Sequence, residues 1–410
     1  MSTESDQKVV IVGGCGHVGL PLGLVLASRG RLVTLLDIDQ SKVEQVNSGC
    51  MPFREEGAEE LLQKLVGKSL SATLDVACLR RADVVITVVG TPVDKHLNPT
   101  VAELYRSVDK LLEQMRDDSL LILRSTVYPG VTKLVYERLQ MLGRQIHLAF
   151  CPERIAEGKA LKELVELPQI VSAFGAEAAY RAERLFLAIT KSVIALAPLE
   201  AELAKLFTNS WRYINFAVSN QFYMLARSYG LDFFRLHDAV TRDYPRMRSF
   251  AKPGFAAGPC LLKDTLQLSA FASNNFFLGH AAMLINEGLP NFMVEQLRPL
   301  NLPLRCVAIL GMAFKGDSDD PRESLSYKLR KLLEVQAKEV LCSDPFVSDP
   351  SLVPLAEAVN KAEIIVLGVP HSLYRDLSFP AEKTVVDVWG FWREKVAETV
   401  PKIAAVRTTH

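Results

Sequence analysis

Short, continuously apolar runs alternate along the chain with longer stretches in which apolar residues recur at helical spacing. The first run, 8–12, is β-branched and ends in a glycine-rich turn, an apolar stretch covers 20–28, and another run follows at 32–37. We predict a strand, a helix and a strand, with further strands at 82–90 and 119–126. Strands that are apolar on both faces are typical of a parallel sheet covered by helices on each side.

A weaker copy of this order lies near the C-terminus. The corresponding runs, the second of which again ends in an aspartate, are at 306–311, 339–344, 362–368 and 383–388. The stretch between the two copies differs, because 200–229 has helical spacing with few breakers and 242–259 is rich in Arg, Pro and Gly. We expect one long helix, a loop and then more helix there.

These patterns predict an α/β protein with two Rossmann-like, doubly wound parallel-sheet domains joined by a long-helix central domain. The expected boundaries are 1–198 for the first Rossmann-like domain, 199–297 for the central dimerisation domain and 298–410 for the C-terminal Rossmann-like domain. Long helices between domains often form subunit interfaces, so we expect a homodimer or a higher homo-oligomer.

Composition and charge narrow the function. Hydrophobic residues make up 49% and charged residues 23% of the 410 residues, which is typical of a globular protein with two or three domains. Lys plus Arg and Asp plus Glu each number 47, so no basic excess favours nucleic acid as a partner. The chain shows no signal-peptide pattern and no apolar run of about 18 residues, so we expect a cytoplasmic protein without membrane contact. Its seven cysteines form no CxxC pair, and we predict no metal site.

The first glycine-rich turn has the spacing of a dinucleotide-binding fingerprint. Gly14, Gly16 and Gly19 lie between the predicted strand and helix, and Asp37 ends the next strand. Such glycines let the backbone approach a pyrophosphate, and the aspartate is placed to accept from a ribose hydroxyl. The carboxylate disfavours NADP, so NAD is the predicted cofactor. The alternative is a glycine turn needed only for packing. The second half lacks this fingerprint because Ala313 occupies the place of the middle glycine.

Three polar pairs, each four residues apart, offer complementary chemistry. The pairs are Glu153 with Glu157, Lys205 with Asn209, and Cys260 with Asp264. Any one of them could be a solvated helix face. Together they supply a thiol to attack an aldehyde, a carboxylate to manage protons and an ammonium to stabilise an alkoxide. Beside an NAD site, these groups favour two successive oxidations through a thioester on Cys260, where neighbouring Lys263 would stabilise a thiolate.

At these residues the sequence resembles the UDP-glucose and UDP-N-acetylmannosamine dehydrogenase family nearly from end to end. The resemblance rests on ordered motifs at Gly14–Pro21, Val89–Pro92, Ser125–Gly130, Cys151–Arg154, Glu202–Asn209, the Cys260 segment and Gly311–Ser324. It implies oxidation of the C6 hydroxymethyl group of a UDP-sugar to a carboxylate, with NAD as the acceptor.

The resemblance also implies roles for individual residues. Cys260 would be the nucleophile, Lys205 and Asn209 would hold the sugar oxygen, and Asp264 would assist proton transfer. Protons and water would be positioned by Glu153, Glu157 and Thr126. The UDP-sugar would be held by Arg154, Ile155, Lys205, Asn209, Arg212, Arg246, Phe255, Gly258 and Lys315, with Arg246 reaching a neighbouring subunit. NAD would be contacted by Gly14, Gly16, His17, Val18, Gly19, Asp37, Lys42, Thr91, Thr126, Lys263 and Arg322.

Some positions depart from the family pattern. The family often has two glycines before the nucleophile region, whereas this chain has Ala257-Gly258-Pro259-Cys260. The following Leu261-Leu262-Lys263-Asp264 resembles UDP-glucose enzymes, but Cys151–Arg154 and Asn209–Arg212 resemble the N-acetyl-sugar branch. The sugar therefore stays open between glucose and an N-acetylhexosamine. Two other hypotheses are a two-electron hydroxyacid or sugar-phosphate dehydrogenase, which needs no thiol, and a nucleotide-binding protein without catalysis.

Overall fold

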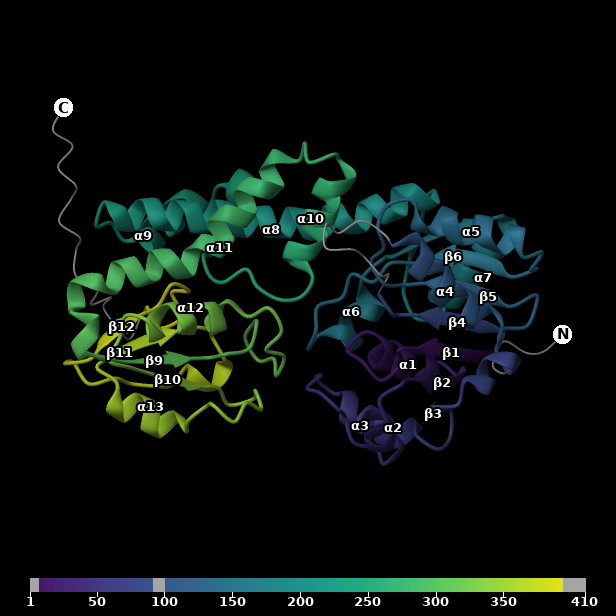
Figure 1. Cartoon of the computed structure of the whole chain (residues 1–410), viewed down its shortest axis with the longest axis horizontal. Helices are drawn as coiled ribbons and strands as arrows, with labels where there is room; N and C mark the ends of the chain where they lie inside the picture. Colours follow the sequence, from purple (N-terminus) through teal and green to yellow (C-terminus); the bar gives the residue numbers. More distant parts are fainter. Residues whose placement is uncertain (1–6, 91–99, 394–410) are drawn as a thin grey trace. The chain divides into compact units, whose positions relative to one another are not determined.

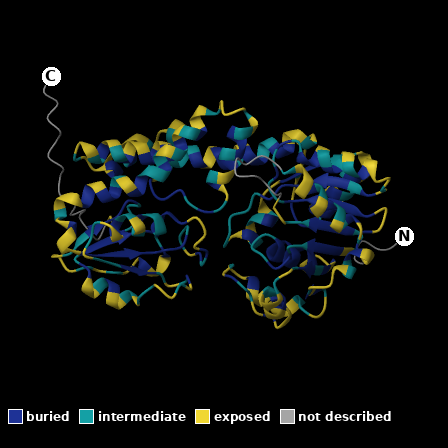
Figure 2. Cartoon of the chain, in the orientation of Figure 1, coloured by how far each residue is buried: buried dark blue, intermediate teal, exposed yellow. Residues whose placement is uncertain are grey.

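The computed structural model describes residues 7–90 and 100–393, which form two compact units. The first unit comprises Met1–Thr208 with Ala270–Ala272, and the second comprises Asn209–Ser269 with Ser273–His410. Each unit is built around its own sheet, whose strands are buried while exposed residues lie mostly on helices and loops (Figure 2).

The sheet of the first unit has eight strands in the order β3-β2-β1-β4-β5-β6-β7-β8. Its strands are β1 (Lys8–Val12), β2 (Leu32–Leu36), β3 (Leu70–Thr73), β4 (Val84–Thr87), β5 (Leu120–Leu123), β6 (His147–Phe150), β7 (Gln169–Phe174) and β8 (Val193–Ala195). All neighbours from β3 to β6 are parallel, β7 runs antiparallel to β6, and β8 is parallel to β7. The predicted parallel, doubly wound sheet is confirmed, and the reversed strand pair at its edge was not predicted.

Alternation along the strands explains why they are apolar throughout. In β1, Val9 and Ile11 belong to one hydrophobic cluster and Val10 belongs to another, because successive side chains point to opposite faces of a sheet. Helices therefore cover both faces (Figure 1). The helical segments of this unit are α1 (Gly19–Ser28), α2 (Gln40–Asn47), α3 (Ala58–Leu65), η2 (Val76–Arg81), α4 (Val101–Leu112), α5 (Val131–Met141), α6 (Ala160–Glu166) and α7 (Ala176–Leu187).

The long predicted helix is α8 (Pro198–Ser228), which has 31 residues and contains the boundary between the two units. Its first turns are fastened to the first unit by Glu202, which is buried. The Glu202 carboxylate accepts from the N–H groups of Gly130 (2.6 Å) and Thr132 (2.8 Å) and from the Thr132 hydroxyl (2.5 Å). These donors lie at the start of α5, where the helix dipole also favours a negative charge.

The second unit contains the remaining helices and a four-stranded parallel sheet in the order β10-β9-β11-β12. Its strands are β9 (Cys306–Leu310), β10 (Glu339–Ser343), β11 (Ile364–Leu367) and β12 (Thr384–Val386). The helical segments are α9 (Phe233–Thr241), η3 (Pro245–Met247), α10 (Leu261–Phe271), α11 (Phe277–Leu297), η4 (Arg298–Leu300), η5 (Leu302–Leu304), α12 (Leu325–Glu334), α13 (Leu355–Lys361) and η6 (Ser372–Tyr374). The four strands predicted from the C-terminal copy are all present, in the arrangement of β2, β1, β4 and β5.

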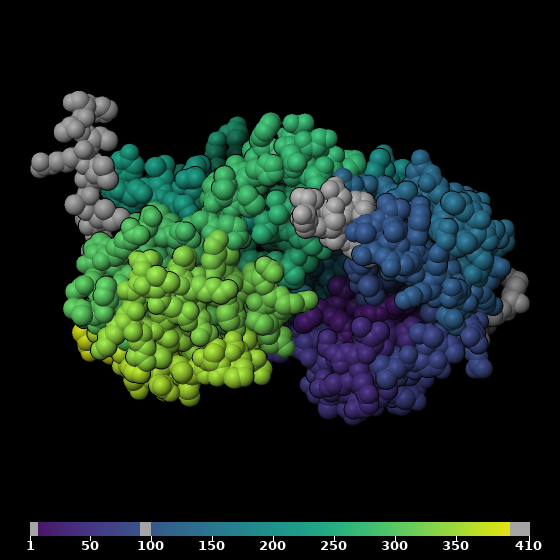
Figure 3. Space-filling model, viewed as in Figure 1, coloured from purple at the N-terminus to yellow at the C-terminus, as the bar shows by residue number. Residues whose placement is uncertain are grey.

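In the second unit, β9 is again buried on both sides. Val307 and Ile309 pack in a cluster with residues of α8, α11 and α12, whereas Ala308 and Leu310 pack in a cluster with α13. Residues of α11 and of this sheet domain form a continuous surface in the space-filling view (Figure 3). Within the described residues, no helix combines the length and apolarity that crossing a bilayer requires.

Candidate active site

The glycine-rich loop follows β1 at the point where the strand order reverses between β1 and β4, which is where doubly wound sheets bind ligands. A Cβ on Gly14 would lie 2.7 Å from the Ile11 carbonyl oxygen, and one on Gly19 would lie 2.7 Å from the Gly14 Cα. Packing therefore requires these two glycines. At Gly16 the nearest atom would be 3.7 Å away, so internal packing does not require this glycine. The open approach to its backbone fits a dinucleotide pyrophosphate.

Asp37 follows β2 and ties the glycine loop to the sheet. Its Oδ2 accepts from the Cys15 N–H at 2.9 Å, and its Oδ1 accepts from the N–H groups of Ile38 and Asp39. Burial, followed by the negative charge of Asp37, raises the pKa of the Cys15 thiol to about 12. Asp37 thus has a structural role in addition to the predicted ribose contact. Lys42, near the start of α2, forms an exposed ion pair with Asp39 at 3.7 Å.

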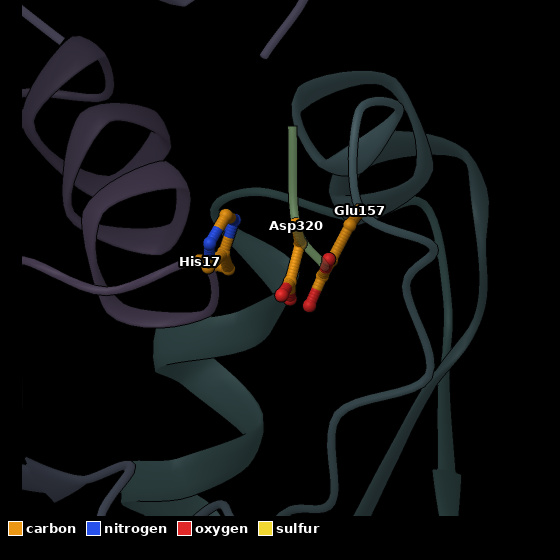
Figure 4. A group of neighbouring side chains, drawn as sticks. All are labelled: His17, Glu157 and Asp320. Atoms are coloured by element: carbon orange, nitrogen blue, oxygen red, sulfur yellow. The ribbon is translucent and has the colours of Figure 1, made fainter. Parts of the chain in front are cut away.

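His17 and Val18 lie between the fingerprint glycines, ahead of α1. The His17 ring lies against Phe53 with the ring centroids 4.0 Å apart. Figure 4 shows His17 with Glu157, another residue of the first unit, and polar atoms of the two side chains lie within 4.8 Å of each other. Asp320, drawn in the same view, belongs to the second unit. The loop around Glu157 is thereby close to the cofactor loop of its own unit.

The segment that carries Glu153 and Glu157 is held by a buried arginine that the sequence analysis did not single out. Arg124 lies directly after β5 and is fully buried. It donates to the Cys151 carbonyl at 3.1 Å and to Gln169 Oε1 at 3.0 Å, and it forms an ion pair with Glu153. The other carboxylate oxygen of Glu153 accepts from the N–H groups of Arg154 (2.7 Å) and Ile155 (3.0 Å). Glu153 therefore orders the loop, while Glu157 is the more exposed residue of the predicted pair.

The rest of this loop is fixed by backbone contacts. The Glu55 carboxylate accepts from the N–H groups of Gly158 (2.8 Å) and Ala160 (2.6 Å), and Glu163 accepts from the N–H of Ala156 at 2.6 Å. The Arg154 guanidinium donates to the Pro168 carbonyl within the same unit.

The carboxyl ends of β1, β4 and β5 border a cavity of about 260 Å³ whose lining includes Thr87, Gly90 and Ser125. Thr126 follows Ser125 and is partly exposed. Thr91, a predicted NAD contact, lies outside the described residues. The cavity is thus at the edge of the sheet at which parallel α/β proteins bind their ligands.

Among the seven cysteines, only Cys50 and Cys260 are exposed. Burial raises the pKa of the Cys151 and Cys342 thiols to about 12 and also raises that of Cys78 and Cys306. Cys260 directly precedes α10, and its carbonyl accepts the Asp264 N–H at 2.9 Å. A helix N-terminus stabilises negative charge, whereas Cys50 follows the C-terminal end of α2. Cys260 therefore combines exposure with a setting that favours a thiolate.

Asp264 is fully buried one turn into α10 and accepts from the Asn209 side-chain amide at 2.6 Å. Its other oxygen lies 3.9 Å from the Lys263 ammonium, which is partly exposed. Lys205 is buried on α8, four residues before Asn209, so the two share a helix face. Within the second unit, the structure thus joins Asn209, Asp264 and the Cys260 turn.

The turn before Cys260 packs against the loop that follows β9. Gly258 has φ +99°, and a Cβ there would lie 2.6 Å from the Phe314 ring, so a side chain at this position would clash. Phe255 is buried against Trp389, with ring centroids 6.4 Å apart. Lys315 follows Phe314 and is partly exposed, with its ammonium 5.6 Å from the Phe314 ring centroid.

Arg212, Arg246 and Arg322 are the remaining predicted contacts. Arg212 is exposed on α8, and Arg246 is exposed in η3, where it donates to the Tyr244 hydroxyl at 3.1 Å. Arg322 forms a close ion pair with the buried Asp320 (Nη2 to Oδ2, 2.5 Å).

Three domain profiles match the chain in order. They are the NAD binding domain (residues 7–189), the central domain (199–287) and the UDP binding domain (308–394) of the UDP-glucose/GDP-mannose dehydrogenase family. UDP-N-acetyl-D-mannosamine dehydrogenase of Pyrococcus horikoshii is 31% identical, over 90% of this chain and 91% of the relative. The chain belongs to the UDP-glucose/GDP-mannose dehydrogenase family.

Solved structures of this dehydrogenase family share the fold of the chain. A structure of the Pyrococcus horikoshii enzyme superposes with a TM-score of 0.83 at 29% identity, covering 90% of this chain and 91% of the other. A UDP-glucose dehydrogenase from Pyrobaculum islandicum gives a TM-score of 0.86 at 26% identity, covering 98% and 99%. The predicted family, the fold class and NAD as cofactor are confirmed, and the relatives are nucleotide-sugar dehydrogenases.

Three buried residues with positioning contacts were not predicted as site residues: Arg124, Glu202 and His371. Arg124 directly follows the apolar run of a predicted strand, and a charged residue at that position is a sequence signal that could have indicated it. Glu202 resembles an ordinary helix-surface acid, and nothing in the local sequence indicates its contacts with α5. His371 lies in a loop after β11, where its partners come from distant segments.

Proposed function

We propose that the protein oxidises the C6 hydroxymethyl group of a UDP-sugar to a carboxylate through a thioester on Cys260. The observation that carries this proposal is the setting of Cys260, an exposed thiol at the start of α10, one turn before the buried Asn209–Asp264 hydrogen bond. The glycine loop and Asp37 would hold NAD. When bound, NAD accepts one hydride in each of two oxidations, so one sugar and one water yield a carboxylate, two NADH and three protons.

The proposed reaction uses the chain's residues in four steps. Lys205 and Asn209 stabilise the C6 oxygen while its proton leaves during the first oxidation. The Cys260 sulfur then adds to the aldehyde carbon to form a thiohemiacetal. Loss of the second hydride and the hydroxyl proton gives the thioester. Water attacks the thioester carbon, and the C–S bond breaks to release the carboxylate and the thiolate.

Proton and water handling is proposed for Glu157, Thr126 and Asp264. Glu157 is the better candidate of the predicted glutamate pair, since the Glu153 carboxylate is occupied by Arg124 and two backbone amides. Asp264 acts beside Asn209 on the oxygen at C6. Glu153 then contributes by ordering the loop that carries Glu157.

The UDP moiety is proposed to bind the C-terminal part of the chain, with Lys315, Gly258 and Phe255 on the second unit. Arg154, Ile155, Arg212 and Arg246 complete the proposed substrate contacts, and Thr126, Lys263 and Arg322 those to NAD. We also propose the domain division 1–198, 199–297 and 298–410, with a homodimer formed through the central domain. The relatives act on UDP-N-acetylmannosamine or UDP-glucose by name, so both UDP-glucose and a UDP-N-acetylhexosamine are candidate substrates.

The decisive experiment incubates the protein with NAD and, in turn, UDP-glucose, UDP-N-acetylglucosamine, UDP-N-acetylmannosamine and GDP-mannose, and counts NADH per sugar consumed. Two NADH and a uronate from a UDP-sugar are expected. One NADH per substrate, with no acid formed, would instead support a two-electron dehydrogenase. No NADH from any sugar in the panel would support a nucleotide-binding protein without catalysis.

A further inference from the structure

A buried histidine closes a hydrogen-bond network in the C-terminal sheet of the second unit. His371 lies after β11 with no solvent exposure, and its Nε2 is 2.9 Å from Oδ2 of Asp344. Its Nδ1 is 3.0 Å from the backbone nitrogen of Asp317. A backbone N–H can only donate, so Nδ1 must be unprotonated and Nε2 must carry the proton that is donated to Asp344. The network therefore requires the neutral imidazole.

The partners of His371 order the loop 311–317 from both ends. Asp344 accepts from the N–H groups of Met312 (2.6 Å) and Ala313 (3.0 Å) at the start of the loop. At its end, Asp317 has φ +57°, and its carboxylate accepts from the Ser372 N–H and hydroxyl, both at 2.8 Å. His371 connects the two ends by bonding to Asp344 and Asp317 together.

Between these anchors the loop carries the two side chains that matter for the proposed site. The Phe314 ring occupies the space that a side chain at position 258 would need. Gly258 lies two residues before Cys260. Lys315 is the proposed contact to the nucleotide sugar. A displacement of the loop would therefore move both the support of the Cys260 turn and a substrate-binding cation.

The His371 ring is closely surrounded. Its Nε2 bonds to Asp344, and the aromatic rings of Phe346 and Tyr374 lie edge-on to it, with ring centroids 5.1 and 5.4 Å away. Burial, followed by the charge of Asp344, raises the pKa of Tyr374, so this phenol stays neutral. Protonation of His371 would set a second N–H against that of Asp317, and the hydrogen bond would be lost.

We propose that His371 is a positioning residue for the nucleotide sugar, in which the unprotonated Nδ1 holds loop 311–317 and with it Lys315 and Phe314. This role rests on the proposed function, because it assumes that the second unit binds the UDP moiety.

Two variants separate the functions of the two ring nitrogens. His371→Asn keeps an acceptor near the place of Nδ1 and does not titrate, whereas His371→Gln keeps a donor near the place of Nε2 and loses the acceptor. His237→Asn is the matched control, since His237 is also a buried histidine of the second unit but bonds to the Phe250 carbonyl, away from the loop.

The probe is UDP-glucose binding by calorimetry without NAD at neutral pH. Loss of one hydrogen bond predicts about three- to tenfold weaker binding. We expect this loss for His371→Gln, whereas His371→Asn should bind UDP-glucose as the unsubstituted protein does. The control should follow the unsubstituted protein.

Amide hydrogen exchange in a peptide covering 312–320 gives a second readout that does not depend on binding. His371→Gln should speed exchange there, and His371→Asn should not. Unchanged exchange in His371→Gln, or equally weak binding by the two His371 variants, would overturn the proposal. If no form of the protein binds UDP-glucose while His371→Gln still speeds exchange, the proposed substrate class fails and the ordering of the loop by His371 stands.

Discussion

At the scale of single residues, environment separates groups that look alike in sequence. Cys15, Cys151 and Cys260 each lie in a motif typical of the family, yet burial raises the pKa of the first two thiols and leaves Cys260 as the exposed one. Glu153 and Glu157 likewise differ, because Arg124 engages only Glu153 in the ion pair described above. Reactivity at this scale is set by what surrounds a side chain, which the residue type does not reveal.

The role of Cys260 is tested by substitution. Cys260→Ala should abolish acid formation, and Cys260→Ser should stall near the aldehyde, because a hydroxyl is a far weaker nucleophile than a thiolate. The measurement is uronate yield by mass spectrometry after incubation with NAD and the UDP-sugar that reacts. Cys50→Ala, which removes the other exposed thiol, should leave the yield unchanged. A normal uronate yield from Cys260→Ala would refute the covalent mechanism.

At the scale of elements, loops are held by acidic residues that lie at the ends of strands. Asp37 after β2 and Asp344 after β10 both accept backbone N–H groups from the loop after the neighbouring strand. The Asp344 carboxylate also accepts from the N–H groups of Phe346 and Val347, so both of its oxygens bond within the fold. This explains why the C-terminal copy retains the aspartate while lacking the glycine fingerprint.

The Asp344 network predicts a pH-dependent stability. Burial raises the pKa of Asp344, but hydrogen bonds from His371 and from backbone amides outweigh it and hold the pKa at about 2. An unfolded aspartate titrates near pH 3.9, so the ionised form stabilises the fold above about pH 4, and this contribution disappears as the pH falls toward about 2.

Replacing Asp344 by Asn should therefore cost about 2 kcal/mol of unfolding free energy at neutral pH, and the deficit should shrink in acid. Urea unfolding of both proteins at about pH 7 and about pH 3 measures it. Asp243→Asn, at an exposed aspartate of the same unit, should cost little at either pH. A deficit that grows on acidification would contradict the assigned pKa direction.

The turn before Cys260 gives a steric prediction. Gly258→Ala should destabilise the protein by about 2–4 kcal/mol, because the new Cβ would meet the Phe314 ring at a positive φ. Gly130→Ala is the matched control, since Gly130 has φ +97° and nothing within 4 Å of the Cβ position, and should cost only the backbone strain of about 1–2 kcal/mol.

Thermal unfolding and the alkylation rate of Cys260 would be measured for both glycine variants. Equal losses of stability in the two would show that the Phe314 contact does not constrain the turn.

Much of the fold followed from the sequence because apolar periodicity reports local structure directly. The predicted strands at 8–12, 119–126 and 306–311 correspond to β1, β5 and β9. Strands β3 and β6 were not predicted, because they contain few β-branched residues. For the candidate site, the glycine fingerprint and Cys260 could be found because their spacing or position carries a signal. Arg124 and His371 could not, since their function lies in hydrogen bonds to segments far away in the chain.

At the scale of the whole molecule, an exposed apolar surface bears on the proposed homodimer. A cavity of about 370 Å³ in the second unit is lined almost entirely by apolar side chains of α8, α9 and η3, including Phe222, Leu225 and Val240. Each of these three side chains is more than 40% exposed. An apolar patch of this kind is typical of a protein–protein interface, in agreement with the proposed homodimer.

Leu225→Glu should shift the protein toward monomers, because burying an unpaired carboxylate in an apolar interface is costly. Light scattering coupled to size-exclusion chromatography measures the mass. Leu142→Glu, at a partly exposed leucine of the first unit outside this cavity, should leave the mass unchanged. A monomeric mass for the unsubstituted protein would refute the dimer.

Helix α8 carries Glu202, Lys205 and Asn209 on one uninterrupted rod that belongs to both units. Because each residue of an α-helix adds about 100° of rotation and 1.5 Å of rise, the spacing of these three residues works as a fixed gauge. Substitutions along the helix keep the relative orientation of these side chains. One inserted residue between Lys205 and Asn209 would turn the Asn209 amide away from the side of the helix that carries the Lys205 ammonium. In evolution, this stretch should therefore accept amino-acid substitutions far more readily than insertions or deletions.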